Sequence, residues 1–303
     1  MRRRSTRQTF PRSGASPSMP SLLHDIPVWV RSAGVQQVPL RQAVHCVLET
    51  IARTPRLRAL LCMKGGILMA LHYDSPRFTT DIDFSTPDSF TEEAEKETVA
   101  LMSAVLPGVG ETLGYDVECR LQGHKVRPNR EGTRVNLTMN IGYALKGTPA
   151  HRRLAAGQSP CSLSIDFSFR ERIPASEEVE IGEGGHLCVY GLTTLVAEKM
   201  RALLQQPLRN RYRRQDVFDL HYLLEQRSEL SLPQWQREVL SDLRIKCEDR
   251  SVSLSADAID DPAVAERAER DYDTLLAEVD GDVPPFHIAF ERVRTYFHTL
   301  PWQ

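Results

Sequence analysis

Two aspartates and a pair of glycines stand close together in the segment KGGILMALHYDSPRFTTDIDFS, residues 64–85. Asp81 and Asp83 alternate with apolar residues, so a period of two places both carboxylates on one face of a strand. Two like charges held side by side repel each other, and a divalent metal with oxygen ligands would compensate them. The pattern predicts a site for Mg²⁺, the usual ion beside phosphates. The other interpretation is a pair of carboxylates that face water from an edge strand.

The glycines Gly65 and Gly66 open an apolar helical segment directly after Lys64. Backbone N–H groups at the positive end of a helix dipole form a ready site for a phosphate, and the lysine adds a point charge. Taken alone, the glycines could make an ordinary turn into a helix. Joined to the two aspartates one short helix later, they predict a nucleotide phosphate cradle that faces a metal site.

A third carboxylate, Asp166, comes from the segment CSLSIDFSFRER. The apolar residues of this strand face one way, so Asp166 shares the other face with Ser164 and Ser168. If the strand pairs beside Asp81 and Asp83, three carboxylates converge to hold one or two metal ions. Asp166 would then also be able to accept a proton from an attacking hydroxyl. A solvated aspartate on an amphipathic strand is the alternative.

The second half of the chain places charged residues on apolar helix faces. In LTTLVAEKMRALL, Lys199 lies seven residues after Leu192 and three after Val196, on the inward face. A buried lysine must meet an anion, and a triphosphate would suit it. In the next helix Asp216 and Asp219 also point inward, so a salt bridge between Lys199 and Asp216 is the second interpretation, compatible with the first.

Basic residues interleave with an aromatic one in RNRYRR, residues 209–214. Arginines around Tyr212 could bind the phosphates of an RNA or of the nucleotide. A solvated helix start is the other interpretation.

The elements that must position these residues form an α+β chain. Alternating segments predict a mixed or antiparallel sheet with flanking helices over residues 21–190, and from Leu192 onward the pattern is helical. We therefore expect a sheet domain at 21–190 and a helical domain at 191–303. Residues 1–20, which are basic, free of acidic residues and rich in Ser and Pro, are expected to form a disordered tail.

The composition excludes several classes of protein. No apolar run reaches the roughly 18 residues that a membrane helix needs. The six cysteines form no CxxC pair, which argues against a zinc site and for free thiols in the cytoplasm. The formal net charge is −2, so any nucleic acid must bind a local patch.

Four motifs in order, from about Leu60 to Leu224, resemble the AbiEii/AbiGii family of toxins: LCMKGGILMALHYDSPRFTTDIDFS, SLSIDFSFRE, LTTLVAEKMRALL and RRQDVFDLHYLL. The resemblance implies a DNA polymerase β-like nucleotidyltransferase domain and a helical C-terminal domain. It implies that Gly65 and Gly66 bind phosphate and that Asp81 and Asp83 bind metal, with Lys199 and Asp216 essential. Ile67 and Gln215 depart from the family pattern, which usually has a hydroxyl and a basic residue there.

The same resemblance implies a role in phage defence or in a toxin–antitoxin pair, with an antitoxin from the same operon that need not bind the toxin. The expected reaction moves NMP from an NTP to an acceptor, RNA and above all the 3′ end of tRNA. In it, Lys64, the glycines and Lys199 would grip the triphosphate, and Arg77 would add charge near it. Alternatives are a small-molecule or protein acceptor, or a nucleotide-binding partner without catalysis.

Overall fold

The computed structural model describes residues 21–22, 25–128, 134–182 and 185–302. The tail expected at 1–20 lies outside these residues. Among the described residues, eight strands form one mixed sheet in the order β1-β7-β8-β2-β3-β6-β5-β4. The strands are β1 Ser21–Leu22, β2 Cys62–Lys64, β3 Asp81–Ser85, β4 Val117–Arg127, β5 Asn136–Leu145, β6 Ser162–Ser168, β7 Ser176–Ile181 and β8 Gly185–Tyr190.

The centre of the sheet joins parallel and antiparallel pairs. Strand β3 lies between β2, to which it is antiparallel, and β6, to which it is parallel. Hairpin-type antiparallel pairing holds for β4 with β5 and for β7 with β8. The α+β class with a mixed sheet is thereby confirmed. Since β3 is an inner strand, the interpretation that its aspartates lie on an edge strand is wrong.

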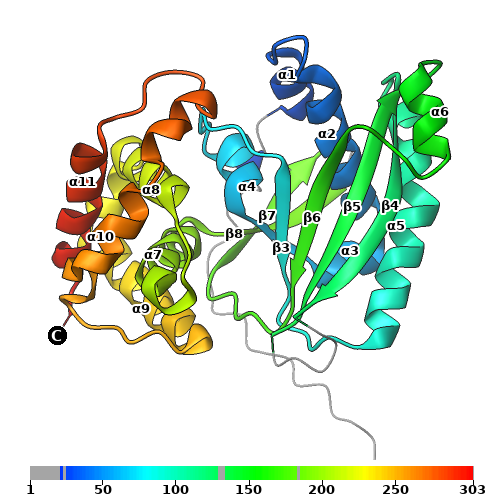
Figure 1. Ribbon diagram of the computed structural model, residues 1–303. Helices are drawn as coiled ribbons and strands as arrows, with labels where there is room; N and C mark the ends of the chain where they lie inside the picture. The colour runs from blue at the N-terminus through cyan, green and yellow to red at the C-terminus, as the bar shows by residue number, and fades with distance from the viewer. Residues whose placement is uncertain (1–20, 23–24, 129–133, 183–184, 303) are drawn as a thin grey trace, which may run out of the picture.

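Each central strand has one apolar and one polar face. Ile82 and Phe84 of β3 are fully buried and align with Ile165 and Phe167 of β6, so these four side chains share one face. Helices α2 and α5 lie behind this face, as Figure 1 shows. Burial of that apolar surface fixes which way the strands face, because a shift by one residue would turn every side chain over. The polar residues between them therefore all project from the opposite face.

Six helices precede Leu192 among the described residues. The expected helix after Gly65 is present as α4, which stands between the sheet and the second half of the chain (Figure 1). Their bounds are α1 Ile26–Arg31, α2 Val38–Arg53, α3 Pro55–Leu60, α4 Gly65–His72, α5 Glu92–Thr112 and α6 Pro149–Ala155.

From Leu192 onward the described residues contain helices and short 3-10 turns. Helix α7 packs against α8, α9 and α10, and α11 packs against α8. The bounds are α7 Leu192–Arg209, α8 Arg214–Gln226, η1 Ser228–Ser231, α9 Pro233–Arg250, η2 Ala258–Asp260, α10 Pro262–Glu269, η3 Tyr272–Ala277 and α11 Phe286–Thr299. We call this part the helical half and the part before it the sheet half; Figure 1 shows them side by side.

Candidate active site

The pairing of β3 with β6 brings three carboxylates onto the polar face of the sheet. Asp83 lies directly opposite Asp166, and Asp81 opposite Ser164 one step along the same face. Burial raises the pKa of Asp83 to about 6, with the charges of Asp166 and Asp81 adding to the effect and Lys64 opposing it. The pKa of Asp81 is raised by burial and by Asp166. The cluster thus holds more negative charge than its protein surroundings compensate.

Two neighbours on β5 hold the Asp166 carboxylate in place. Asn136 Nδ2 and Thr138 Oγ1 both donate to its Oδ1, at 2.9 and 2.5 Å. Thr138 lies directly opposite Asp166 in the ladder. Sequence reasoning named neither residue, although the alternation of polar residues with Leu137 and Met139 along this strand is the signal that places both on the polar face.

The glycines lie against this cluster for steric reasons. Gly65 has φ +75°, and a Cβ built on it would lie 2.2 Å from Asp83 Oδ2. A Cβ on Gly66 would lie 2.8 Å from Thr79 Cγ2 and 3.1 Å from Arg77 Nη2. A side chain at Gly65 would therefore displace the Asp83 carboxylate, and one at Gly66 would displace the Thr79 side chain and crowd Arg77. Because glycine has no side chain, a space stays open between the start of α4, Asp83 and Arg77.

Lys64 lies on the same side of the sheet as Asp83, its partner in the ladder, but its ammonium group binds a different acid. Lys64 Nζ is 2.5 Å from Oε2 of Glu171, a buried residue that also accepts from Ser85 and Arg250. Burial opposes the charge of Lys64, yet Glu171 outweighs it, so the pKa of Lys64 is raised. The lysine is charged and already neutralised, which leaves it a weaker phosphate ligand than the sequence suggests.

Four charged side chains meet where the helical half faces the glycines. Lys199 Nζ lies 3.2 Å from Asp216 Oδ1 and 2.6 Å from Asp219 Oδ2, and Asp219 also accepts two bonds of 2.8 Å from Arg77. The predicted salt bridge between Lys199 and Asp216 is confirmed. Burial opposes the charge of Lys199, but Asp219 and Asp216 raise its pKa, while Arg77 and Lys199 lower that of Asp219 to about 2.

A short backbone contact ties this group to the rest of the helical half. Arg77 and Val279 form a β-bridge, with Phe78 N–H donating to Glu278 O at 2.6 Å and Asp280 N–H donating to Pro76 O at 3.0 Å. Residues 74–80 therefore connect the two halves twice, through the backbone and through the buried pair of Arg77 with Asp219. The structure thus places Asp83 against Gly65 and Arg77 against Gly66.

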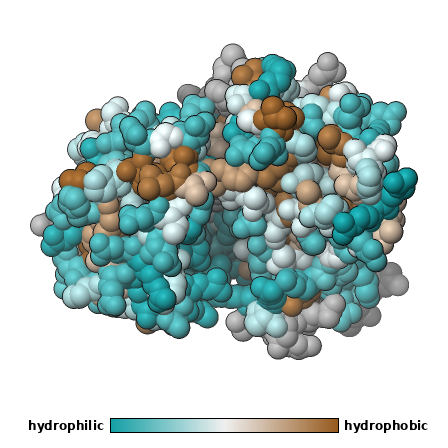
Figure 2. All heavy atoms as spheres, turned by 45° about the horizontal axis from the view of Figure 1, so that its top comes forward, coloured by the Kyte–Doolittle hydropathy of each residue, from teal (hydrophilic) through white to brown (hydrophobic). Residues whose placement is uncertain are grey.

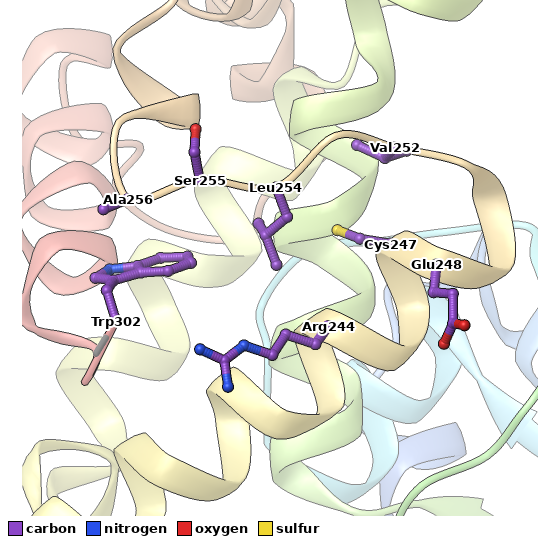
Figure 3. A pocket seen from close by; sticks show the side chains of 8 residues that line it. All are labelled: Arg244, Cys247, Glu248, Val252, Leu254, Ser255, Ala256 and Trp302. Atoms are coloured by element: carbon purple, nitrogen blue, oxygen red, sulfur yellow. The ribbon is translucent and has the colours of Figure 1, made fainter.

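Two cavities lie among the described residues, one beside this arrangement and one apart from it. One of about 780 Å³ borders Arg77 and Thr79, and buried Ile67 lines it from α4. The other, of about 350 Å³, lies in the helical half between the end of α9 and Trp302 (Figure 3). Its thiol, Cys247, is buried with a pKa raised to about 12, so this cavity presents no ready nucleophile. Figure 2 shows mostly hydrophilic residues on the face turned forward, with a hollow between the halves.

The family model of the AbiEii toxin, a nucleotidyltransferase of type IV toxin–antitoxin systems, matches residues 47–298. This match spans both halves and every candidate site residue. The chain belongs to the AbiEii family. It is therefore a nucleotidyltransferase, with an NTP as substrate and a cognate antitoxin implied by the type IV system. A comparison with curated proteins gave no match.

Two solved structures share the fold of this AbiEii protein. MenT4, a nucleotidyltransferase toxin from Mycobacterium tuberculosis H37Rv, is 19% identical, with 90% of this chain and 88% of that chain covered and a TM-score of 0.52. A candidate nucleotidyltransferase from H. pylori is 15% identical, with 88% and 96% covered and a TM-score of 0.50. At these identities the likeness concerns the fold.

A divalent metal is general for nucleotidyltransferases, and the acid cluster of this AbiEii protein has suitable chemistry. Within the described residues, no three His, Cys, Asp or Glu side chains are arranged as a ready-made metal site. The donors are nevertheless hard oxygen ligands, and the pKa of Asp83 is raised by burial and, less strongly, by the charges of Asp166 and Asp81, which a bound cation would compensate. No helix among the described residues is long and apolar enough to cross a membrane.

Proposed function

We propose that this AbiEii protein transfers NMP from an NTP to RNA, with the 3′ end of tRNA as the acceptor. The observation that supports the transfer most is the placement of Asp83 opposite Asp166 and against Gly65, while Arg77 lies beside Gly66. Phosphates need N–H donors and positive charge, whereas a metal needs the acids. Gly66 and Arg77 suit the phosphates, and Asp83 and Asp166 beside them suit the metal.

Each side chain has a role that its surroundings support. The N-terminus of α4 at Gly65 and Gly66 binds phosphate oxygens, and Arg77 stands beside Gly66 with its charge fixed by Asp219. Lys199 contributes positive charge toward the same space, since its field lowers the pKa of Asp83. Asp166, oriented by Asn136 and Thr138, accepts the proton of the attacking hydroxyl.

Mg²⁺ would be held by Asp81 and Asp83, with Asp166 as a third donor, and it would supply charge stabilisation for the in-line displacement at the α-phosphorus. The acceptor oxygen forms a bond to that phosphorus while the bond to the β-phosphate oxygen breaks, so pyrophosphate leaves. Asp216 keeps Lys199 in position at 3.2 Å. Because Lys64 is bound to Glu171, we assign it to holding the sheet half rather than to the triphosphate.

In the cell, we propose that the protein acts in the cytoplasm as the toxin of a toxin–antitoxin pair or in phage defence. Its antitoxin comes from the same operon and need not bind the toxin. The type IV toxin–antitoxin family supports the part of this proposal that concerns a cognate antitoxin.

The test is label transfer from each of four radiolabelled NTPs to total tRNA with Mg²⁺. Wild type should label tRNA, Asp83→Asn should not, and Glu93→Gln, which changes an exposed acid of α5 behind the apolar face of the sheet, should behave like wild type. Transfer RNA whose 3′ diol has been oxidised with periodate should accept no label. Wild type indistinguishable from Asp83→Asn, or label found only in a small molecule or a protein, would contradict the RNA acceptor.

A further inference from the structure

The turn between α7 and α8 and the end of α10 carry cations around an exposed tyrosine, and of these cations Arg213 and Arg267 are half-buried and the others exposed. We define this arginine patch by the side chains that the turn and α10 project to the surface: Arg209, Arg211, Tyr212, Arg213, Arg267 and Arg270. Among the described residues, Arg209, Arg211, Arg213 and Arg267 form no ion pair with a carboxylate, whereas Arg270 has only a contact of 3.9 Å with Asp271. In a chain of net charge −2, such a cluster is a local excess of positive charge.

The patch is held rigidly although it lies on a turn. Asn210 adopts the left-handed conformation that ends α7, and the N–H groups of Arg211 and Arg213 donate to the backbone and side chain of Gln206, at 3.1 and 2.7 Å. Gln206 is itself 1% exposed and bonded to Val264 O of α10. The turn is therefore fixed to the core, and little conformational entropy is lost when it binds a ligand.

The centre of the patch is an aromatic ring flanked by guanidinium groups. Tyr212 is 41% exposed, and Cζ of Arg270 and of Arg267 lie 4.4 and 5.7 Å from its ring centroid. Arg267 also donates to Asn210 Oδ1 at 2.9 Å. An exposed ring with cations around it can stack an unpaired base while the arginines bind the adjoining phosphates. A base inside a duplex offers no such face.

The patch is close to the candidate active site along the chain. Arg213 precedes Asp216 by three residues, and its carbonyl oxygen accepts the Asp216 N–H at 3.0 Å. Arg214 between them binds Glu278, the residue whose carbonyl oxygen accepts from Phe78 in the 74–80 segment. A strand bound at the patch would therefore begin within one helical turn of a residue that holds Lys199.

We propose that the arginine patch binds the single-stranded end of the nucleic acid that accepts the nucleotide, with one base stacked on Tyr212 and its phosphates on Arg209, Arg211 and Arg213. This inference rests on the proposed function for the identity of the acceptor, but the binding itself does not require catalysis. The ligand chemistry, a flexible polyanion with unpaired bases, is common to RNA and DNA, so the experiment must separate them.

The experiment measures binding of fluorescent single-stranded RNA, single-stranded DNA and duplex RNA to the full chain, without NTP, over a series of salt concentrations. The test variant is Arg209→Gln/Arg211→Gln, and the matched control is Arg237→Gln/Arg244→Gln, two exposed arginines of α9 without ion pairs among the described residues. The test variant should reduce the slope of log Kd against log salt by about 1.4. The control should keep the wild-type slope.

A second pair of variants tests the ring. Tyr212→Leu should weaken single-strand binding about fivefold or more and leave duplex binding almost unchanged, whereas Tyr212→Phe should retain wild-type binding. RNA bound more tightly than DNA of the same sequence supports an RNA acceptor, and the reverse order supports DNA. Equal losses in the test and control double variants, or wild-type binding by both Tyr212→Leu and the test variant, would overturn the proposal. Because no NTP is present, absent label transfer in the earlier test would overturn the proposed function alone.

Discussion

Arg77 of the sheet half and Asp219 of α8 form a two-bond ion pair, with Nε and Nη2 each 2.8 Å from a carboxylate oxygen. Asp219 is fully buried and also accepts from Lys199 at 2.6 Å. A single carboxylate thus orients two cations that come from opposite halves of the chain. Together with the backbone bridge between Arg77 and Val279, it fixes the relative position of the two halves beside Gly66.

Removing either partner of this pair should be costly. Asp219→Asn and Arg77→Met should each lower the free energy of unfolding by about 3–5 kcal/mol, since each leaves a buried charge uncompensated. The double variant should lose less than the sum. The measurement is urea unfolding of all three variants. Arg294→Gln, which breaks the surface pair with Asp260, serves as the control and should leave stability unchanged. If the losses of the two single variants add up in the double variant, Arg77 and Asp219 contribute to stability independently of each other.

Asp83→Asn should separate stability from activity. The pKa of Asp83 is raised above its ordinary value by burial, so its charged form is disfavoured in the metal-free protein. A neutral amide should raise the free energy of unfolding by about 1–2 kcal/mol at neutral pH. Transfer should fall by more than about 100-fold, since loss of a metal ligand exceeds the effect of an outer-shell change. Thermal unfolding and initial rates measure both. If Asp83→Asn is less stable than wild type but keeps its activity, Asp83 has a structural role and does not bind the metal.

Gly65→Ala should impair the site through sterics. The positive φ costs about 1–2 kcal/mol for alanine, and the new Cβ would displace the Asp83 carboxylate. We expect lower stability and lost transfer, measured by unfolding and label incorporation. Gly108→Ala in α5 is the matched control, because nothing lies within 4 Å of its added Cβ, and it should be neutral or slightly stabilising. Full activity of Gly65→Ala would show that phosphate oxygens do not approach Gly65 closely.

His45 should make stability depend on pH. It is buried in α2 with Nδ1 2.9 Å from the Tyr115 hydroxyl, and burial, aided by Arg53, lowers its pKa to about 4. The unfolded state binds a proton near pH 6.5 while the folded state does not, so the contribution is complete above that pH. It is lost progressively as pH falls to about 4, by about 3 kcal/mol.

The measurement is urea unfolding at several pH values between 7 and 4. His45→Gln should show a flatter decline with acid than wild type, and His287→Gln, an exposed residue of α11, should follow wild type. Identical slopes in all three proteins would mean that other groups govern the acid sensitivity.

The sequence by itself determined the local elements and the chemical types of the site. Alternation fixed the faces of the central strands because one face had to be buried, and so Asp81, Asp83 and Asp166 had to project from the other. Helical periodicity likewise placed Lys199 inward. These conclusions depend only on the spacing of apolar residues within one segment of the chain and on the need to bury them.

Only the tertiary structure decided which charges meet. Nothing local to Arg77 indicates that its partner is Asp219, and nothing local to Lys64 indicates that Glu171 neutralises it. These partners lie more than a hundred residues apart in the chain, and burial alone requires only that some opposite charge be present. The packing of the two halves selects the partner. It fixes Arg77 of the sheet half and Lys199 of the helical half on the same carboxylate of Asp219.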